Sequence, residues 1–312
     1  MKQPIAFVTN IEREEVDQWL ELFSEVMPEE ESVPFDQVTD LTAIEIAIVA
    51  NPRPEDLLKL PNLKWIQSLW AGVEGILKEK SLDHIPLARM TDPNLAVTMA
   101  EAVLAWTLYL HRDMPKYAEQ QQARIWKQQP FVRAEERSVG ILGLGKLGLR
   151  SAETLLAAGF KVLGWSRSLK NIDGVETFAG DKGLNNILNQ SDIVVNLLPH
   201  TPSTWNLLNE ETFGQMKAGA SLINFGRGAT VEPNSLIAAL DSGHLKHAVL
   251  DVFKKEPLPD DNALWVHPKV TILPHISAPT DPKTASQLVA DNIKSYRSSG
   301  TIPTVVDRSL GY

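Results

Sequence analysis

Three polar residues in the second half of the chain have the types needed to reduce a carbonyl group. Arg227 stands between two glycines, Glu256 stands before a proline and His275 follows another proline, each shortly after an apolar run. A guanidinium can hold a carboxylate through two parallel hydrogen bonds, so Arg227 could bind a 2-oxo acid and polarise its carbonyl. His275 could protonate the carbonyl oxygen, and Glu256 could orient the imidazole and raise its pKa.

Each of these residues also has a simpler interpretation when it is taken alone. The arginine could be an exposed turn residue, the glutamate a solvated one, and a single loop histidine is most often a surface or capping residue. We give that simpler interpretation to four other histidines, and we assign no catalytic role to His200. The four are His84, His111, His244 and His267. Because ligands bind at the carboxyl ends of strands in such sheets, the ordered set predicts one catalytic site.

A second group of residues has the spacing of a dinucleotide-binding turn. Gly143, Gly145 and Gly148 are spaced as Gly-x-Gly-x-x-Gly, between an apolar run at 139–142 and a helical pattern at 146–158. The first glycine permits a tight turn, the second lets the backbone approach a pyrophosphate, and the third lets helix and strand pack closely. The N–H groups at the helix start would face the phosphates. The expected contacts are Gly143, Gly145, Lys146, Leu147 and Gly148.

The end of the next expected strand predicts which dinucleotide binds. The run 161–165 is followed by Ser166, Arg167 and Ser168, where an NAD site usually has an acidic residue for the ribose 2′-hydroxyl. No carboxylate is present there to repel a 2′-phosphate, and Arg167 could pair with one. We therefore expect NADPH as the preferred cofactor, with NADH possible. The alternative is that Arg167 is a solvated surface residue.

Apolar runs alternate with helical patterns along the whole chain, which predicts parallel α/β structure. From residue 139 onward the alternation predicts a doubly wound sheet of about six strands, so a separate domain precedes it. The expected strands are 5–8, 44–50, 65–69, 139–142, 161–165, 192–197, 220–225, 247–251 and 270–273, and the clearest expected helices are 13–26, 92–110 and 281–298.

Composition limits the possible partners and compartments. The 312 residues carry a net charge of −9 and contain no cysteine. An acidic chain without a basic run is not expected to bind nucleic acid, and thiolate metal sites and disulfides are excluded. No segment approaches about 18 consecutive apolar residues, and the apolar start is too short for a signal peptide. We therefore expect a cytoplasmic protein that does not associate with membranes.

At the candidate site, the chain resembles the D-isomer-specific 2-hydroxyacid dehydrogenase family. The resembling segments are Ala71-Gly72-Val73, 196–202, Gly226-Arg227-Gly228, Asp251-Val252-Phe253 with Glu256-Pro257, and Pro274-His275. The resemblance implies a Rossmann doubly wound parallel sheet inserted into a flavodoxin-like α/β substrate domain. The implied boundaries are 1–97 with 280–312 for the substrate domain and 98–279 for the NADP-binding domain.

Within the family, Trp165-Ser166-Arg167, the ending at 307–312 and the length are similar to a bacterial group that reduces glyoxylate and hydroxypyruvate. This resemblance implies NADPH-linked reduction of glyoxylate to glycolate and of hydroxypyruvate to D-glycerate, by a homodimer joined through its cofactor domains and the helix near 94–111. It also implies further site residues. Those are Ala71, Gly72 and Val73 with Arg227 for the substrate carboxylate, and Leu198, Pro199 and Asp251 for the cofactor.

One segment departs from the family pattern. Many members continue the catalytic histidine with Gly-Ser-Ala-Thr and an arginine several residues on, whereas this chain has Ile-Ser-Ala-Pro-Thr at 276–280 and no arginine nearby. The rim of the substrate pocket therefore differs from the family pattern, which leaves the preference among small 2-oxo acids open. One alternative function is the reduction of a larger 2-oxo acid, such as phenylpyruvate or 2-ketoisocaproate. A second alternative is a dinucleotide-sensing interaction protein, because related corepressors use this fold for partner binding.

Overall fold

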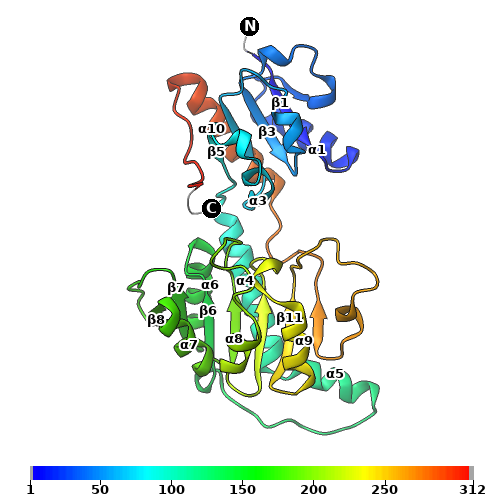
Figure 1. Ribbon diagram of the computed structural model, residues 1–312, viewed down its shortest axis with the longest axis vertical. Coiled ribbons are helices and arrows are strands. Elements are labelled where there is room, and N and C mark those ends of the chain that lie inside the picture. Colours follow the sequence, from blue (N-terminus) through cyan, green and yellow to red (C-terminus); the bar gives the residue numbers. More distant parts are fainter. Residues whose placement is uncertain (1–2, 309–312) are drawn as a thin grey trace. The chain divides into compact units, whose positions relative to one another are not determined.

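The computed structural model describes residues 3–308, so the motif residues Ser309 to Tyr312 lie outside the described part (Figure 1). The chain forms two compact units. One comprises the residues up to Asn94 together with those from Thr280 onward, and the other is Leu95–Pro279. Each unit contains one parallel sheet with helices on both faces, which confirms the predicted α/β class. No helix within 3–308 is long and apolar enough to cross a membrane.

The first unit has a five-stranded sheet in the order β2-β1-β3-β4-β5, which is the flavodoxin-like order. Its strands are β1 (Ile5–Thr9), β2 (Ser32–Pro34), β3 (Ile46–Ala50), β4 (Trp65–Ser68) and β5 (Leu87–Ala88), and its helices are α1 (Arg13–Val26), α2 (Pro54–Leu57), α3 (Glu74–Leu77) and α10 (Pro282–Ser299). The short strands β2 and β5 were not predicted, because two or three residues give no readable periodicity.

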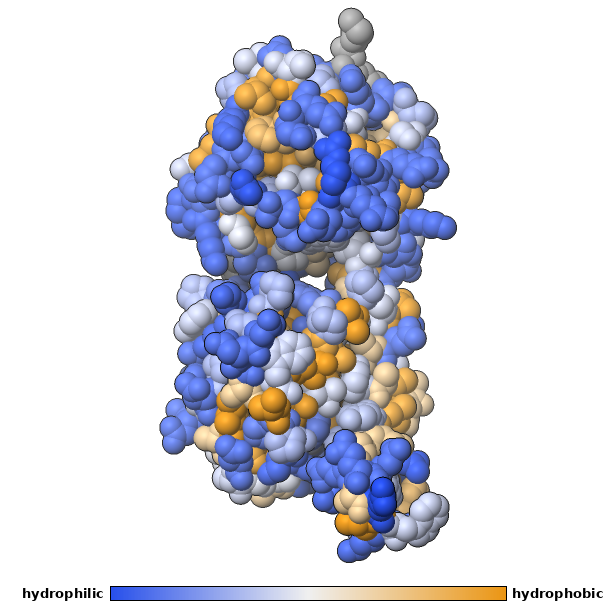
Figure 2. Space-filling view, turned by 90° about the vertical axis from the view of Figure 1, so that its right-hand side faces the viewer, coloured by the Kyte–Doolittle hydropathy of each residue, from blue (hydrophilic) through white to orange (hydrophobic). Residues whose placement is uncertain are grey.

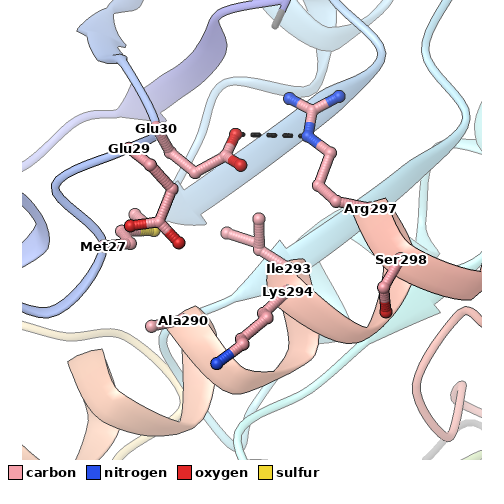
Figure 3. Close-up of a pocket in the computed structure, with 8 residues that line it drawn as sticks. All are labelled: Met27, Glu29, Glu30, Ala290, Ile293, Lys294, Arg297 and Ser298. Atoms are coloured by element: carbon pink, nitrogen blue, oxygen red, sulfur yellow. Dashed lines mark hydrogen bonds and ion pairs between the residues drawn. The ribbon is translucent and has the colours of Figure 1, made fainter.

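The alternation of side chains along β1 shows how this sheet is covered. Ile5 and Phe7 pack with α1 and α10 on one face, whereas Ala6 and Val8 pack with α2 and α3 on the other. The C-terminal helix α10 therefore completes the core of the first unit. Figure 3 shows a pocket beside this helix, with a volume of about 250 Å³. In it, Arg297 Nε lies 3.2 Å from Oε2 of Glu30, whose side chain is 3% exposed.

The second unit has a seven-stranded sheet in the order β12-β11-β10-β9-β6-β7-β8. Its strands are β6 (Ser138–Leu142), β7 (Lys161–Ser166), β8 (Val175–Ala179), β9 (Ile193–Asn196), β10 (Ala220–Asn224), β11 (Leu245–Leu250) and β12 (Val270–Ile272). Counted from β6, this is the Rossmann order 3-2-1-4-5-6 with one strand added. The edge strand β8 was not predicted, since its half-exposed Glu-Thr-Phe-Ala residues lack a continuous apolar run.

Helices cover both faces of this second sheet. Their bounds are α4 (Pro93–His111), α5 (Met114–Gln122), α6 (Lys146–Ala157), α7 (Gly180–Gln190), α8 (Glu210–Gln215) and α9 (Pro233–Asp241). Ile141 packs with α4 and α6, whereas its neighbour Leu142 packs in the core formed by α7, α8 and α9. Figure 2 shows hydrophobic residues reaching the surface in patches among hydrophilic ones.

Candidate active site

The three candidate catalytic residues follow three neighbouring strands of the second unit. Arg227 comes after β10, Glu256 after β11 and His275 after β12, and these strands are adjacent and parallel. Their carboxyl ends therefore meet at one edge of the sheet. The structure brings two of the side chains into direct contact, because Nδ1 of His275 lies 2.8 Å from Oε2 of Glu256.

The electrostatics of this pair favour a charged imidazole. The hydrogen bond with Glu256 raises the pKa of His275, against the opposing effect of burial. Burial by itself would raise the pKa of Glu256, but the hydrogen bonds from His275 and from the Phe253 N–H bring it below the ordinary value. The charge of Arg227 lowers the pKa of both groups, which places the guanidinium within electrostatic reach of the pair.

A buried aspartate fixes the turn that carries the histidine. Asp251 is only 1% exposed. Its two carboxylate oxygens accept hydrogen bonds from the N–H groups of Ile276 at 2.7 Å and Ser277 at 2.9 Å. The Asp251 carbonyl accepts the His275 N–H at 3.0 Å. His275 has a φ of +58°, in the left-handed region that costs a non-glycine residue energy, so these bonds hold it there. The predicted cofactor contact of Asp251 stays a prediction.

The Gly-Arg-Gly sequence has a steric explanation. A Cβ atom on Gly226 would lie 2.6 Å from the Leu198 carbonyl oxygen, and one on Gly228 would lie 2.0 Å from the Phe253 carbonyl carbon. The segment after β10 is thus wedged between the segments after β9 and β11, and only glycine fits on either side of Arg227. The half-buried Arg227 side chain also donates from Nη1 to the Gly226 carbonyl at 2.8 Å.

The glycine turn has the form that a dinucleotide requires. Gly143 has a φ of +105°, and a Cβ atom on Gly148 would lie 1.9 Å from the Gly143 oxygen. Around Gly145, by contrast, a Cβ atom would meet nothing within 4 Å. The turn is therefore closed on the protein side and open at the start of α6, where Lys146 and Leu147 begin the helix. A pyrophosphate fits this cradle.

The end of β7 carries a basic cluster, one member of which the sequence interpretation missed. Ser166 donates from Oγ to the Ser168 carbonyl at 2.8 Å, and Arg167 between them is exposed. Lys170 donates from Nζ to the Leu144 carbonyl at 2.5 Å, so its ammonium lies against the glycine turn. This donor set fits a 2′-phosphate. The signal was present in the sequence as a lysine three residues after the arginine.

Another residue missed from the sequence is Ser277. Its hydroxyl is buried and has no hydrogen-bond partner among residues 3–308, directly beside the turn that carries His275. A buried hydroxyl without a partner is costly, so a polar group of a bound cofactor would fit there. Leu198, followed by Pro199, approaches the glycine turn: its Cδ2 would lie 3.4 Å from a Cβ atom on Gly143.

The remaining predicted residues belong to the first unit. Ala71, Gly72 and Val73 follow β4, at the carboxyl end of that sheet, and lead into α3. The Val73 carbonyl accepts the N–H groups of Ile76 at 3.0 Å and Leu77 at 3.1 Å, so the segment ends in a defined helical turn. No cluster of metal-ligating side chains occurs in the described part of the chain.

Fold and site together define the second unit as a Rossmann-type dinucleotide-binding domain with a hydrogen-bonded glutamate–histidine pair and an arginine at its strand ends. Residues 104–277 match the sequence model described as "D-isomer specific 2-hydroxyacid dehydrogenase, NAD binding domain". The chain belongs to the D-isomer specific 2-hydroxyacid dehydrogenase family, whose members are NAD(P)-dependent oxidoreductases.

Individual relatives agree with this membership. Glyoxylate/hydroxypyruvate reductase A from Salmonella paratyphi B is 39% identical over 282 residues, which cover 88% of this chain and 90% of that protein. A family member from Xanthobacter autotrophicus, solved with NADPH and MES, is 34% identical with a TM-score of 0.93. An NADPH-dependent glyoxylate/hydroxypyruvate reductase from Sinorhizobium meliloti, solved with NADP and sulfate, is 33% identical with a TM-score of 0.93. Both structural matches cover 100% of each chain.

Proposed function

We propose that this protein reduces small 2-oxo acids with NADPH, converting glyoxylate to glycolate and hydroxypyruvate to D-glycerate. The observation that carries the proposal is the 2.8 Å contact between Glu256 and His275, at the same sheet edge as Arg227 and the glycine turn. The reductase names of relatives 39% and 33% identical support the choice of substrates.

His275 would act as the proton donor. Because Nδ1 is engaged by Glu256, Nε2 is the nitrogen that can give its proton to the substrate carbonyl oxygen. Arg227 would hold the adjacent carboxylate and align the carbonyl, and we propose that the N–H groups of Ala71, Gly72 and Val73 bind the same carboxylate. A bound NADPH supplies the hydride that adds to the carbonyl carbon, so the 2-oxo acid, NADPH and one proton give the 2-hydroxy acid and NADP⁺.

The cofactor would be held by residues of the second unit alone. Its pyrophosphate would lie at the glycine turn and its 2′-phosphate at Arg167 and Lys170, with Ser277 available for a further polar contact. Further predicted contacts are Lys146, Leu147, Ser166, Ser168, Leu198, Pro199 and Asp251. We expect NADPH to be preferred over NADH for two reasons. No acidic residue directly follows β7, and two relatives were solved with NADPH or NADP.

We also propose that the protein is a homodimer joined through α4 and the segment that follows it. Ile125, Trp126 and Phe131 in this segment are 54%, 101% and 75% exposed. The Gln120 amide donates to the carbonyls of Ile125 at 3.3 Å and Lys127 at 2.8 Å, so the segment is ordered by its own hydrogen bonds. Exposed apolar side chains on an ordered segment are typical of an interface.

A light-scattering measurement tests the dimer with two matched variants. We expect a dimer mass for the wild type and for Val266→Glu, which changes a residue that is 85% exposed elsewhere on the second unit. Trp126→Glu should shift the mass toward the monomer. A wild-type monomer, or a Trp126→Glu dimer as stable as the wild type, contradicts this interface.

The activity is tested by following NADPH oxidation with glyoxylate, hydroxypyruvate, phenylpyruvate and 2-ketoisocaproate. We expect the two small acids to react with the highest kcat/KM. His275→Ala should lose roughly 10²–10⁴-fold in kcat, the usual contribution of general acid catalysis, whereas His84→Ala at an exposed position should not. Preference for the larger acids would favour the alternative dehydrogenase, and no turnover with any acid would favour a sensing protein.

A further inference from the structure

A buried polar network lies beneath Arg227. Asn196 at the end of β9 donates from Nδ2 to Oδ1 of Asn224 at 2.8 Å and to Oγ1 of Thr230 at 2.6 Å. Thr230 in turn donates from Oγ1 to the Arg227 carbonyl at 2.6 Å. The Asn196 side-chain oxygen accepts the Leu198 N–H at 3.2 Å. The segments at the ends of β9 and β10 are thus joined through these side chains.

At the centre of this network, the side-chain amide of Asn196 and the hydroxyl of Thr230 have all their hydrogens in hydrogen bonds. Asn196, Asn224 and Thr230 are each at most 1% exposed. Both amide hydrogens of Asn196 are used, and the Thr230 hydroxyl accepts one hydrogen bond and donates another. Buried polar groups that satisfy one another rigidify their surroundings, and removing one member leaves the rest without partners.

Arg227 is the residue on which this network ends. Its carbonyl accepts from the Thr230 hydroxyl, from the Thr230 N–H at 3.1 Å and from Asn224 Nδ2 at 3.5 Å. The flanking Gly226 and Gly228 lie so close to neighbouring backbone that a Cβ atom on either would clash. The hydrogen bonds from Thr230 and Asn224 therefore determine how the Arg227 backbone is oriented. The backbone orientation in turn sets the direction in which the Arg227 side chain extends.

We propose that Asn196, Asn224 and Thr230 are positioning residues for Arg227, and that they set the affinity for the carboxylate of the substrate. This inference rests on the proposed function, in which Arg227 binds that carboxylate. The three side chains are buried, so we expect them to act on the substrate through Arg227 and not by direct contact. Its loss should weaken binding of molecules that bear the carboxylate, while leaving the cofactor site and the Glu256–His275 pair intact.

The test replaces the Thr230 hydroxyl by a methyl group of similar size. Thr230→Val should raise the KM for glyoxylate and the inhibition constant of oxamate, a carboxylate-bearing analogue, by the same factor of about ten or more. The Kd for NADPH should stay within about threefold, and kcat should fall less than KM rises. Thr230→Ser, which keeps the hydroxyl, should restore both constants to near the wild-type values.

A matched control makes the same exchange where the hydroxyl has no partner. Thr107 is buried in α4, and its Oγ1 makes no hydrogen bond within residues 3–308. Thr107→Val should therefore leave all the constants unchanged. If Thr230→Val does not fold, Thr230→Ala removes the same hydroxyl with less bulk and carries the same expectation.

The outcomes separate this inference from the proposed function. If wild-type protein does not reduce glyoxylate, or if Arg227→Lys keeps normal kinetics, the proposed function fails. If wild-type protein reduces glyoxylate and Arg227→Lys does not, but Thr230→Val has wild-type constants, the positioning network alone is overturned. An equal loss in NADPH affinity and in KM for Thr230→Val also overturns it, because that pattern indicates general structural damage.

Discussion

Oε2 of Glu256 lies 2.8 Å from Nδ1 of His275, while Oε1 of the same carboxylate accepts the Phe253 N–H at 2.8 Å. Both oxygens are therefore fixed, one by the backbone of its own loop and one by the imidazole. The arrangement selects one ring nitrogen for the carboxylate and leaves the other for a ligand. It also ties the proton affinity of His275 to the charge of Glu256.

The first prediction concerns the pH dependence of reduction. His275 must be protonated to act as an acid, and its pKa is raised by the hydrogen bond with Glu256, so activity should persist above the ordinary histidine range and fall as the pH rises through that pKa. Glu256→Gln removes the negative charge, which should move this fall toward lower pH. The measurement is kcat/KM for glyoxylate against pH at saturating NADPH.

Glu210→Gln at an exposed position of α8 is the matched control for this experiment, and its profile should equal that of the wild type. A Glu256→Gln profile that coincides with the wild type would mean that the pair does not control proton donation.

The second prediction concerns the choice of cofactor. A charge-assisted hydrogen bond contributes about 1.5–3 kcal/mol, so Arg167→Ala and Lys170→Ala should each raise the KM for NADPH roughly 10–100-fold. The KM for NADH should change little, because NADH lacks the 2′-phosphate. Lys182→Ala, at an exposed position of α7, should change neither constant. An unchanged ratio of NADPH to NADH preference in both site variants would remove these residues from the phosphate site.

The third prediction concerns the wedge that carries Arg227. The Cβ atom of Gly228→Ala would lie 2.0 Å from the Phe253 carbonyl carbon, so the segments after β10 and β11 must move apart. We expect a lower thermal midpoint and loss of most glyoxylate reduction, because Arg227 and Glu256 lie on those two segments. Gly214→Ala in α8 meets nothing within 4 Å and should stabilise the protein by roughly 0.5–1 kcal/mol. Full activity in Gly228→Ala would contradict the wedge.

The local motifs of this chain were readable because each depends on short sequence spacing. In the glycine turn, Gly143 has a φ of +105° and Gly148 lies close to the Gly143 carbonyl. The spacing of the three glycines implies both features. The adjacency of Glu256 and His275 could also be predicted, because both follow strands of one parallel sheet. Glu256 was also expected to orient the imidazole of His275. The ring nitrogen that it engages could not be predicted, since the ring position depends on the positive φ of His275 and on the hydrogen bonds that Asp251 accepts from the residues beside it.

Other parts of the site lay beyond sequence reasoning for a physical reason. Asn196, Asn224 and Thr230 are polar residues at or near strand ends, where a single sequence gives no sign that they meet. The Gly-Arg-Gly sequence was interpreted as a turn around a binding arginine, whereas its glycines are required by the backbone of two other segments. Such contacts arise from tertiary packing, and no local periodicity records them.

The last prediction uses a histidine outside the site. His247 on β11 is 5% exposed, its Nε2 lies 2.9 Å from the Thr271 hydroxyl, and its ring packs against Tyr109. Burial lowers the pKa of His247 to about 4, from an ordinary 6.5. The unfolded chain therefore binds a proton there at a higher pH than the folded protein does, so this group's contribution to stability is complete above pH 6.5 and decreases as the pH falls toward 4.

The difference in the pKa of His247 between the folded and unfolded states corresponds to about 3 kcal/mol of the free energy of unfolding. About 2 kcal/mol of this stability is lost as the pH falls from about 6.5 to about 5. The thermal midpoint of the wild type should thus fall across that interval more steeply than that of His247→Gln, which cannot titrate. His84→Gln, at an exposed position, should retain the wild-type slope. Equal slopes for the wild type and His247→Gln would mean that His247 is protonated in the folded protein as readily as in the unfolded chain.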